Sequence, residues 1–310
     1  MTPASRAIHV ALGLLTILAA GCSTALRLPP LTGTDALPRR AEVAGVPFFQ
    51  QERYYCGPAS LAMALAWAGN PVAPDDLVPQ VYTPGREGTL RTDILAAARR
   101  HGQLAVPVTT LSDLLAELAA GHPVVVFQNL GLSWIPRWHF AVAIGYDLDA
   151  GTLVLHSGTR ARATTSLRIF ERTWMRGDRW AVVILPPSVL PATAAEAAVV
   201  SAASGLERAG RHADAAAAYV TLLRRWPASY AGLVGLGNAR YRLADDAGAE
   251  DAFRRAIHVR PDEPAAWNNL AHALARQKRR DEAIIAAETA LRLAGGDGET
   301  YRATLSEVSR

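Results

Sequence analysis

The sequence predicts an α+β domain followed by an all-α repeat domain, and three observations support this division. Apolar residues recur at helical spacing over much of 56–121, whereas 123–185 consists mainly of short apolar runs separated by turn residues. Helices that precede an antiparallel sheet are typical of the α+β class. Beyond residue 195 the chain is rich in alanine, and Pro227 and Pro261 lie 34 residues apart, a period that indicates a helical repeat.

Composition supports two domains and excludes several functions. The chain has 310 residues, half of them apolar, and a net charge of only +4. No basic stripe is interleaved with aromatic residues, so we expect no nucleic-acid partner. The histidines lack metal-ligand spacing, and the sequence contains no C-x-x-C, H-E-x-x-H or phosphate-loop motif. We therefore predict no metal and no cofactor.

Residues 1–21 are predicted to be a targeting segment. Arg6 precedes an apolar run, Ala7–Ala20, that is too short to span a membrane. The run ends L-A-A-G-C at Cys22, which resembles the signal of bacterial lipoproteins. That resemblance implies cleavage before Cys22 and a lipid on its thiol, and Ser23 resembles the type sent to the outer membrane. An ordinary secretory signal with a chance cysteine is the alternative.

Residues 22–43 are predicted to be a tether between the lipid and the folded chain. The segment contains three prolines and a glycine without hydrophobic periodicity. A membrane-bound protein of the bacterial cell envelope, anchored by lipid on the periplasmic side of the outer membrane, is the localisation that we expect.

Cys56 is predicted to lie at the start of a buried helix. Gly57 and Pro58 follow it, proline is favoured in the first turn, and Ala59–Ala68 are mostly good helix formers before a stop at Gly69. The positive end of such a helix favours a nucleophilic thiolate. The alternative is that Cys56 is a small buried hydrophobe.

The remaining elements of the first domain, residues 44–186, follow in order along the chain. We expect a loop over 70–84, because it contains four prolines. The other expected elements are a helix from about 88 to 102, a strand at 106–108, a helix capped by Thr110 or Ser112 and ended by Gly121, strands at 123–127, 140–146 and 152–155, a helix at 167–175 and a strand at 180–185.

His139 is the candidate general base. It opens the strand that continues through Phe140, and a histidine at the mouth of a strand can face a cleft. A single histidine in such a place is usually structural, so its weight comes from the combination with Cys56. A cysteine at a helix mouth followed by a histidine in the second half of the domain is the papain-type order.

Over about Val46–Leu185 the sequence resembles the bacteriocin-processing cysteine peptidases, which are papain-like domains that cut double-glycine leaders. In that family a glutamine lies six positions before the cysteine, here Gln50. Glycine and a helix of small residues follow the cysteine, here Gly57–Ala66. An aromatic residue and a valine-rich strand follow the histidine, here His139–Ile144.

The resemblance assigns a role to each of these residues. Cys56 is expected to be the nucleophile, and His139 to take its proton and return it to the leaving amine. The Gln50 amide is expected to stabilise the oxyanion together with the Cys56 backbone N–H. Gln51 is adjacent, and the family spacing favours Gln50 over it.

One position departs from the family pattern. The family orients its histidine with an aspartate at the end of the next strand, where this chain has His156 and Ser157. Either side chain could accept a hydrogen bond from His139, without the charge that would stabilise imidazolium. A neutral third group also serves in papain-like enzymes, whose third residue is asparagine. Asp147 and Asp149 lie in the preceding turn, too far along the strand.

Residues 195–310, after a linker at 187–194, resemble tetratricopeptide repeats. About three units are expected, near the minimum for a stable array. The expected packing positions are Val199, Ala203, Ala215, Tyr219 and Leu222 in the first unit, Leu233, Leu236, Gly237, Ala249, Phe253 and Ala256 in the second, and Trp267, Leu270, Ala271, Ala283, Ala287 and Ala290 in the third. Such arrays present a concave face to peptides or partner proteins.

Three functions remain open at this point. The first is a lipid-anchored cysteine peptidase that acts on a peptide or protein substrate and recruits a protein partner through its repeats. The second is a protein-binding scaffold on a peptidase fold that is weakly active or inactive, because the aspartate is absent. The third is another acyl transfer on Cys56, by a transpeptidase or amidase.

Overall fold

The computed structural model describes residues 36–51, 55–295 and 298–310. The chain divides into two compact units, Met1–Gly33 and Thr34–Arg310, and all the described residues belong to the second. The predicted signal segment, Cys22 and most of the predicted tether therefore lie outside the described residues. Among the described helices, none has the length and hydropathy needed to span a membrane.

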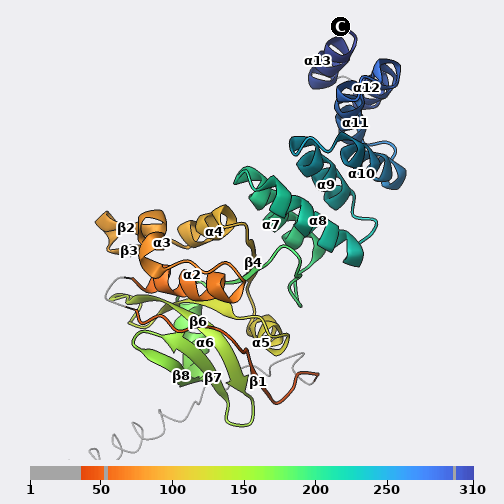
Figure 1. The fold of residues 1–310 in the computed structure, drawn as a ribbon. Coiled ribbons are helices and arrows are strands. Elements are labelled where there is room, and N and C mark those ends of the chain that lie inside the picture. The colour runs from red at the N-terminus through yellow and green to blue at the C-terminus, as the bar shows by residue number, and fades with distance from the viewer. Residues whose placement is uncertain (1–35, 52–54, 296–297) are drawn as a thin grey trace, which may run out of the picture. The chain divides into compact units, whose positions relative to one another are not determined.

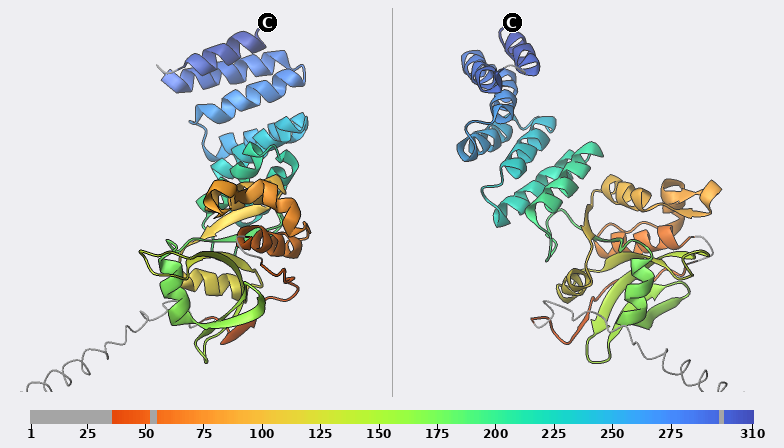
Figure 2. Two further views of the ribbon diagram at one scale, coloured as in Figure 1. Left: turned by 90° about the vertical axis from the view of Figure 1, so that its left-hand side faces the viewer. Right: turned by 180° about the vertical axis from the view of Figure 1, so that it is seen from behind.

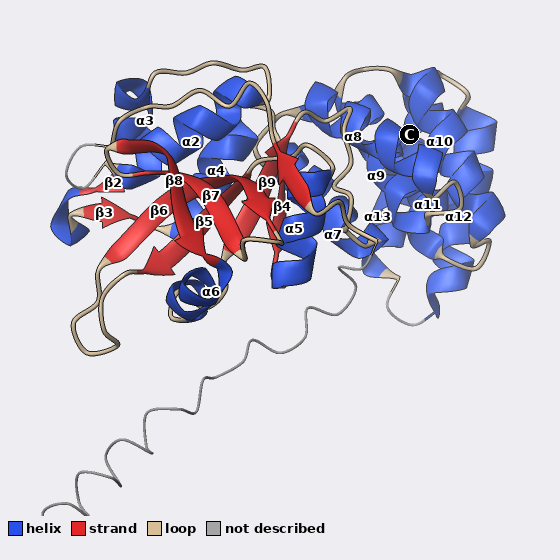
Figure 3. Cartoon of the chain, turned by 90° about the horizontal axis from the view of Figure 1, so that it is seen from below, coloured by secondary structure: helices blue, strands red, loops and turns tan. Residues whose placement is uncertain are grey.

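The first part of the second unit is an antiparallel sheet with helices on both faces (Figures 1 and 3). The strand order is β4-β9-β5-β6-β7-β8, and β1 pairs with β6 off this path. The strands are β1 (Arg40–Glu42), β4 (Leu104–Val108), β5 (Val124–Asn129), β6 (Trp138–Asp147), β7 (Thr152–Ser157), β8 (Arg160–Ser166) and β9 (Ala181–Leu185). This confirms the predicted α+β class.

Helices α2 (Cys56–Trp67), α3 (Pro74–Val81) and α4 (Arg91–Arg100) lie on one face of the sheet, and α6 (Leu167–Met175) lies on the other (Figure 3). The core between α2 and the sheet is mainly apolar. It includes Leu61 and Leu65 of α2, Val125 of β5 and Phe140 of β6, all at most 1% exposed. Burial of these side chains fixes the start of α2 against β6.

Several predicted elements are confirmed closely. Gly69, with φ of 86°, follows the end of α2, and Thr110 caps α5 (Leu111–Ala119) by accepting a hydrogen bond from the Asp113 N–H at 3.0 Å. Helix α6 has the predicted bounds, with Ser166 as its cap. Each of these helix ends is marked in the sequence by a residue whose side chain bonds to a backbone N–H that has no partner within the helix, or by a glycine that tolerates positive φ.

The predicted loop at 70–84 is wrong, because it contains α3. Pro74 occupies the first turn, where its missing N–H costs nothing, and Asp75 and Asp76 follow it at the positive end of the helix. Leu77 and Val81 are buried beneath. The four prolines of this stretch therefore include one that starts a helix.

Three short elements were not predicted. A small hairpin, β2 (Tyr82–Thr83) and β3 (Gly88–Thr89), is joined by the 3₁₀ turn Pro84–Arg86. Strand β8 is polar, and the apolar alternation of a predictable strand is therefore missing. Strand β1 lies within the predicted tether, at Arg40–Glu42, and it approaches Gly145 so closely that a Cβ there would lie 2.6 Å from the Ala41 carbonyl oxygen.

The second part of the unit consists of antiparallel helix pairs (Figure 2). The helices are α7 (Glu196–Arg208), α8 (His212–Arg225), α9 (Tyr230–Arg242), α10 (Asp246–Val259), α11 (Pro264–Arg276), α12 (Arg280–Ala294) and α13 (Glu299–Val308). The predicted packing positions are buried, apart from a partly buried Trp267. Gly237 meets the Phe253 ring so closely that a Cβ would lie 2.3 Å from it, which explains the glycine at this position of α9.

Candidate active site

Cys56 and His139 line one cleft of about 980 Å³. Cys56 is the first residue of α2, and His139 is the second residue of β6, the strand against which α2 packs. The other lining residues include Gln51, Thr89, Arg91, Phe127, Trp138 and Gly158. The fold thus brings together the two residues that the sequence assigns to nucleophile and base, from positions 83 apart in the chain.

The Cys56 thiol is not activated in the way that we predicted. Backbone hydrogen bonds from Phe140, Gly57 and Cys56 itself favour its thiolate form, as expected at a helix start. Burial outweighs them and raises the pKa of the Cys56 thiol above its ordinary value. The prediction of a lowered pKa failed because the depth of the sulfur cannot be read from the helix motif, and the thiol is therefore neutral at pH 7.

His139 is also neutral at pH 7. Burial, with a smaller effect of the nearby Arg137 charge, lowers the pKa of its imidazole to about 4. Its Nε2 lies 2.8 Å from the Ser157 hydroxyl oxygen, which leaves Nδ1 free of any hydrogen bond within the described residues. The cleft therefore holds a neutral thiol and a neutral imidazole.

The two candidates for orienting His139 separate clearly. Ser157, the last residue of β7, makes the hydrogen bond just described. His156 is buried elsewhere, with Nε2 3.3 Å from the Val46 carbonyl oxygen and Nδ1 accepting the Arg162 N–H at 3.1 Å. Adjacent strand residues point to opposite faces, and only one of the pair can reach the cleft.

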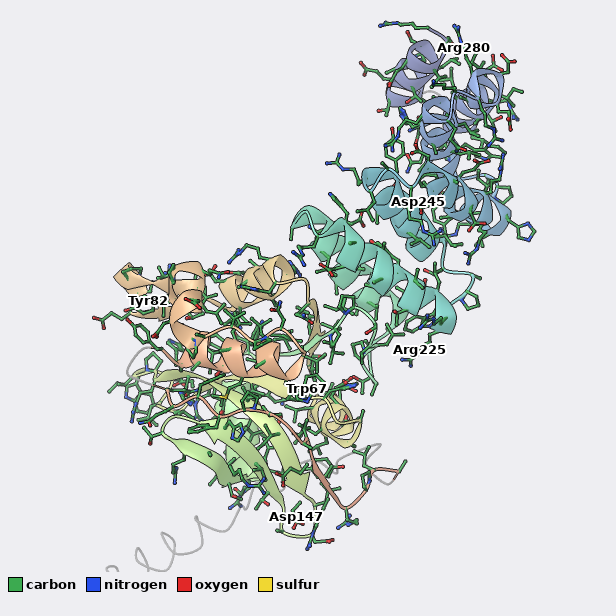
Figure 4. All side chains as sticks on the ribbon, viewed as in Figure 1. Trp67, Tyr82, Asp147, Arg225, Asp245 and Arg280 are labelled. Atoms are coloured by element: carbon green, nitrogen blue, oxygen red, sulfur yellow. The ribbon has the colours of Figure 1, made fainter. Side chains whose placement is uncertain are left out.

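Carboxylates of the β6–β7 turn do not take the orienting role. Asp147, labelled in Figure 4, is the last residue of β6, whereas His139 lies at the strand's start. The Asp147 carboxylate pairs with Arg40 at 2.8 Å and accepts hydrogen bonds from the Asp149 and Ala150 N–H groups. Asp149 pairs with Arg39 at 2.7 Å.

The two adjacent glutamines lie in different environments. Gln50 is exposed and does not line the cleft. Gln51 lines it and is buried, with its Nε2 donating to the Ser60 hydroxyl at 3.0 Å and to the Phe140 carbonyl at 3.3 Å. Its Oε1 accepts the Gly158 N–H at 2.8 Å. The structure favours Gln51 over Gln50 as the cleft glutamine, although the family spacing points to the other.

Sequence reasoning missed the wall of the cleft that the β2–β3 hairpin supplies. The Thr89 side chain lies directly against Gly57, where a Cβ would be only 2.2 Å from its hydroxyl oxygen. Arg91 follows it, lying 5.6 Å from the Phe127 ring centroid and 3.0 Å from the Asp178 carboxylate. The only signal for this contact was the glycine after Cys56, which permits close approach.

Within the described part of the chain, no group of three or more His, Cys, Asp or Glu side chains could hold a metal ion. The groups gathered around Cys56 and His139 include a serine hydroxyl, a carboxamide and backbone N–H donors. This set is suited to acyl transfer through a covalent thioester.

Comparisons with known proteins agree with this division of the chain. Residues 43–180 match the Peptidase C39 like family, and residues 200–258 and 247–298 match the tetratricopeptide repeat. No curated protein matches the chain.

Solved structures are similar to each part separately. A putative C39-like peptidase from Bacillus anthracis is 21% identical, with a TM-score of 0.41, over 47% of this chain and 97% of that one. The Sgt2 tetratricopeptide domain from Aspergillus fumigatus is 20% identical, with a TM-score of 0.36, over 37% of this chain and 77% of that one. From the family matches, the chain carries a peptidase C39-like domain followed by tetratricopeptide repeats.

Proposed function

We propose that this protein is a cysteine peptidase of the bacterial cell envelope, in which Cys56 attacks a peptide bond with His139 as general base. The observation that carries the proposal is the arrangement of His139. Its Nε2 is engaged by Ser157, and both Cys56 and His139 line the same cleft. A base held through one ring nitrogen presents the other to its proton donor, which is the logic of a catalytic triad.

The reaction begins from a neutral pair. As the Cys56 sulfur attacks the scissile carbonyl, its proton passes to Nδ1 of His139, and the N–H at Nε2 donates to the Ser157 hydroxyl oxygen. The imidazolium then protonates the leaving amine, which departs and leaves a thioester on Cys56. Water attacks the thioester, with His139 accepting its proton, and the acid product and free thiol are released.

The oxyanion is stabilised by the Gln51 carboxamide and the Cys56 backbone N–H. In the free protein the Gln51 Nε2 makes two hydrogen bonds, and the one to the Phe140 carbonyl is the longer, at 3.3 Å. This N–H is the one that turns to the oxyanion when substrate fills the cleft. The bond from Gly158 to Oε1 holds the amide in place meanwhile.

The parts outside the cleft supply location and recruitment. A lipid on Cys22 anchors the protein to the outer membrane, facing the periplasm, and 22–43 act as tether. The repeats recruit a protein substrate or partner, as helical repeat arrays do through their concave face. Cleavage after double glycine, as in the leader peptidases that the sequence resembles, is the first specificity to test.

A cysteine-directed activity probe on the purified full chain tests the proposal. The probe is expected to label Cys56 in the wild type, and Cys56→Ala is expected to abolish labelling and peptide cleavage. His139→Ala is expected to lower the cleavage rate by about 10²–10⁴-fold, the usual contribution of a general base. Labelling and cleavage that are unchanged in His139→Ala would contradict the assigned roles.

A second function, a peptidase-fold binding scaffold with little turnover, is favoured by one specific observation. His139 contacts a hydroxyl in place of a carboxylate, and the pKa of its imidazole is lowered to about 4. Ser157→Asp separates the two functions, because a carboxylate beside His139 raises its pKa by about 1–3 units. If the protein is an enzyme, the acid limb of its pH–rate profile for peptide cleavage is expected to move to higher pH in this variant. A scaffold would keep its binding partners and would give no cleavage product in either form.

A further inference from the structure

The loop between β5 and β6 projects from the sheet (Figure 3), and it carries four exposed apolar side chains. We call Leu130, Leu132, Trp134 and Ile135 the apolar tip. Trp134 is 75% exposed and Ile135 is 64% exposed, and all four are among the exposed large hydrophobic residues of the described chain. Apolar side chains gathered in this way usually mark an interaction site.

The exposure of the tip is built into the fold. The Leu130 N–H donates to the Arg137 carbonyl at 2.9 Å, and the Leu132 N–H donates to the Ile135 carbonyl at 3.2 Å. The Asn129 side-chain oxygen also accepts the Gly131 and Arg137 N–H groups, at 2.9 and 2.8 Å. These bonds close the loop as a hairpin, and the tip side chains are held outward instead of folding onto the sheet.

The tip lies outside the cleft that holds Cys56. The residues of this loop that line the cleft begin at Pro136 and Arg137, and no member of the apolar tip is among them. A substrate in the cleft would therefore leave Trp134 and Ile135 exposed. A protruding hairpin also offers no concave surface of the kind that binds small ligands.

Basic side chains lie on the loop itself and along α6, and the end of α6 is bonded to the base of the tip. We call Arg137, Arg168, Arg172 and Arg176 the arginine rim. Arg176 of α6 donates to the Asn129 backbone carbonyl at 3.0 Å, which joins this helix to the hairpin. Arg168 and Arg172 are exposed on α6 beside the exposed Ile169 and Met175, at positions that share one helix face.

The arginine rim is largely free of acidic partners. Within the described residues, none of its four members forms an ion pair, whereas the nearby Arg179 is paired with Glu171 at 2.7 Å. Tryptophan and isoleucine at a projecting edge, backed by unpaired arginines, are complementary to a lipid surface with acidic headgroups. A protein partner would instead require a shaped apolar pocket for the tip.

We propose that the apolar tip inserts into the interfacial region of an anionic lipid bilayer, with the arginine rim contacting the lipid phosphates. This inference goes beyond the proposed peptidase function and does not depend on it or on a lipid at Cys22. Because Pro136 and Arg137 belong to both the loop and the cleft, the membrane surface would lie beside the entrance to the cleft.

Vesicle flotation of the full chain carrying Cys22→Ser tests this surface without a covalent lipid. Vesicles of phosphatidylcholine alone are compared with vesicles that also contain phosphatidylglycerol. Trp134→Ser with Ile135→Ser is expected to weaken binding to the mixed vesicles about tenfold or more. Arg168→Gln with Arg172→Gln is expected to weaken it about fivefold or more at low salt and to leave binding to phosphatidylcholine unchanged.

Matched variants on the repeats control for a general loss of apolar or basic surface. Ile285 is 61% exposed on α12, against 64% for Ile135, and Arg224 is exposed on α8 and forms no ion pair with any described residue. Ile285→Ser and Arg224→Gln are expected to bind as the parent does. The apolar run at 7–20 adds the same background to every variant, so the differences between variants carry the result.

A spectroscopic measurement keeps the test independent of folding. Brominated acyl chains are expected to quench tryptophan fluorescence when the full chain binds. The part of the fluorescence that is quenched is expected to be mostly absent in Trp134→Phe and to be retained in Trp226→Phe. Quenching that is unchanged in Trp134→Phe would overturn the proposal. The proposal would also be overturned if the tip variants changed only the sedimentation coefficient, because the tip would then bind a second copy of the chain. It would be overturned as well if they changed only peptide cleavage, because the tip would then bind substrate.

Discussion

The peptidase-like part and the repeats are stabilised by different kinds of contact. In the repeats, the fully buried positions are mostly alanine, leucine and aromatic residues, and the buried Glu250 carboxylate pairs with Arg254 and Arg279, whose own side chains are partly exposed. In the peptidase-like part, polar groups such as Gln51, His156 and Glu117 are buried and hydrogen-bonded. A periodic apolar pattern therefore specifies the contacts of the repeats, whereas the contacts of the peptidase-like part depend on individual long-range polar pairs.

The strongest test of this difference in stability is the pair Glu117→Ala and Glu250→Ala. Glu117 is fully buried on α5, and its carboxylate accepts from Thr193 N–H and hydroxyl and Ala192 N–H and contacts His122 at 2.7 Å. Its removal leaves several part-buried donors without this partner, and we expect a loss of about 3–5 kcal/mol in the free energy of unfolding.

Glu250→Ala is the matched change in the repeats, where the partners Arg254 and Arg279 have half-exposed or partly exposed side chains. Water can replace a lost partner there, and the expected loss is smaller. Urea denaturation of the full chain, followed by circular dichroism, measures both. Equal losses in the two variants would show that the exposure of the partners does not set the cost of removing a buried carboxylate.

A second test concerns the adjacent glutamines of the cleft. Gln51→Ala is expected to lower kcat by about 10²–10³-fold, because it removes an oxyanion donor. Gln50→Ala changes an exposed side chain outside the cleft and is expected to leave kcat unchanged. Peptide cleavage measured at saturating substrate decides between them, and the reverse outcome would restore the family spacing as the better guide.

These contrasts explain how much of the molecule the sequence could predict. The repeats were predicted down to Phe253 and Gly237, because packing positions recur with a fixed period. In the first part, α6 was predicted at about 167–175, and the structure places it at Leu167–Met175. The cleft was predicted only as a meeting of Cys56 and His139, without its walls.

What could not be predicted depends on orientation and burial. Gln50 and Gln51 differ by one position, and only the folded chain shows which side chain turns inward. The raised pKa of the Cys56 thiol comes from the burial of its sulfur, and a helix motif in the sequence does not indicate how deeply that sulfur is buried. Glu117 and Thr193 are 76 residues apart, and no local pattern connects them.

A third test returns to the close contacts of the repeats. A Cβ at position 237 would lie 2.3 Å from the Phe253 ring, on which several neighbouring residues pack. Gly237→Ala is expected to cost about 1–3 kcal/mol through overpacking, partly offset by about 1 kcal/mol of helix propensity. Thermal unfolding measures the net effect, and Phe253→Leu in the same chain is expected to relieve it. A stabilised single variant would show that the helices can separate freely.

A fourth test follows a change of stability with pH that originates in the cleft. The pKa of folded His139 is about 4, below its ordinary value of 6.5, so the unfolded chain binds a proton first as the pH falls. The resulting stability is present above about pH 6.5 and is lost progressively toward pH 4, by on the order of 3 kcal/mol. His101 and His156, whose pKa values are also lowered by burial, add to the same window.

The contribution of His139 is therefore the difference between the wild type and His139→Gln, which cannot titrate. Glu117, with its pKa lowered by hydrogen bonds, acts only below its ordinary value of 4.5 and does not overlap the upper part of the window. Urea denaturation between pH 7 and pH 5 is expected to show a shallower loss in His139→Gln. Parallel curves would mean that the imidazole remains accessible to water, and the neutral resting pair in the cleft would have to be replaced by an ion pair.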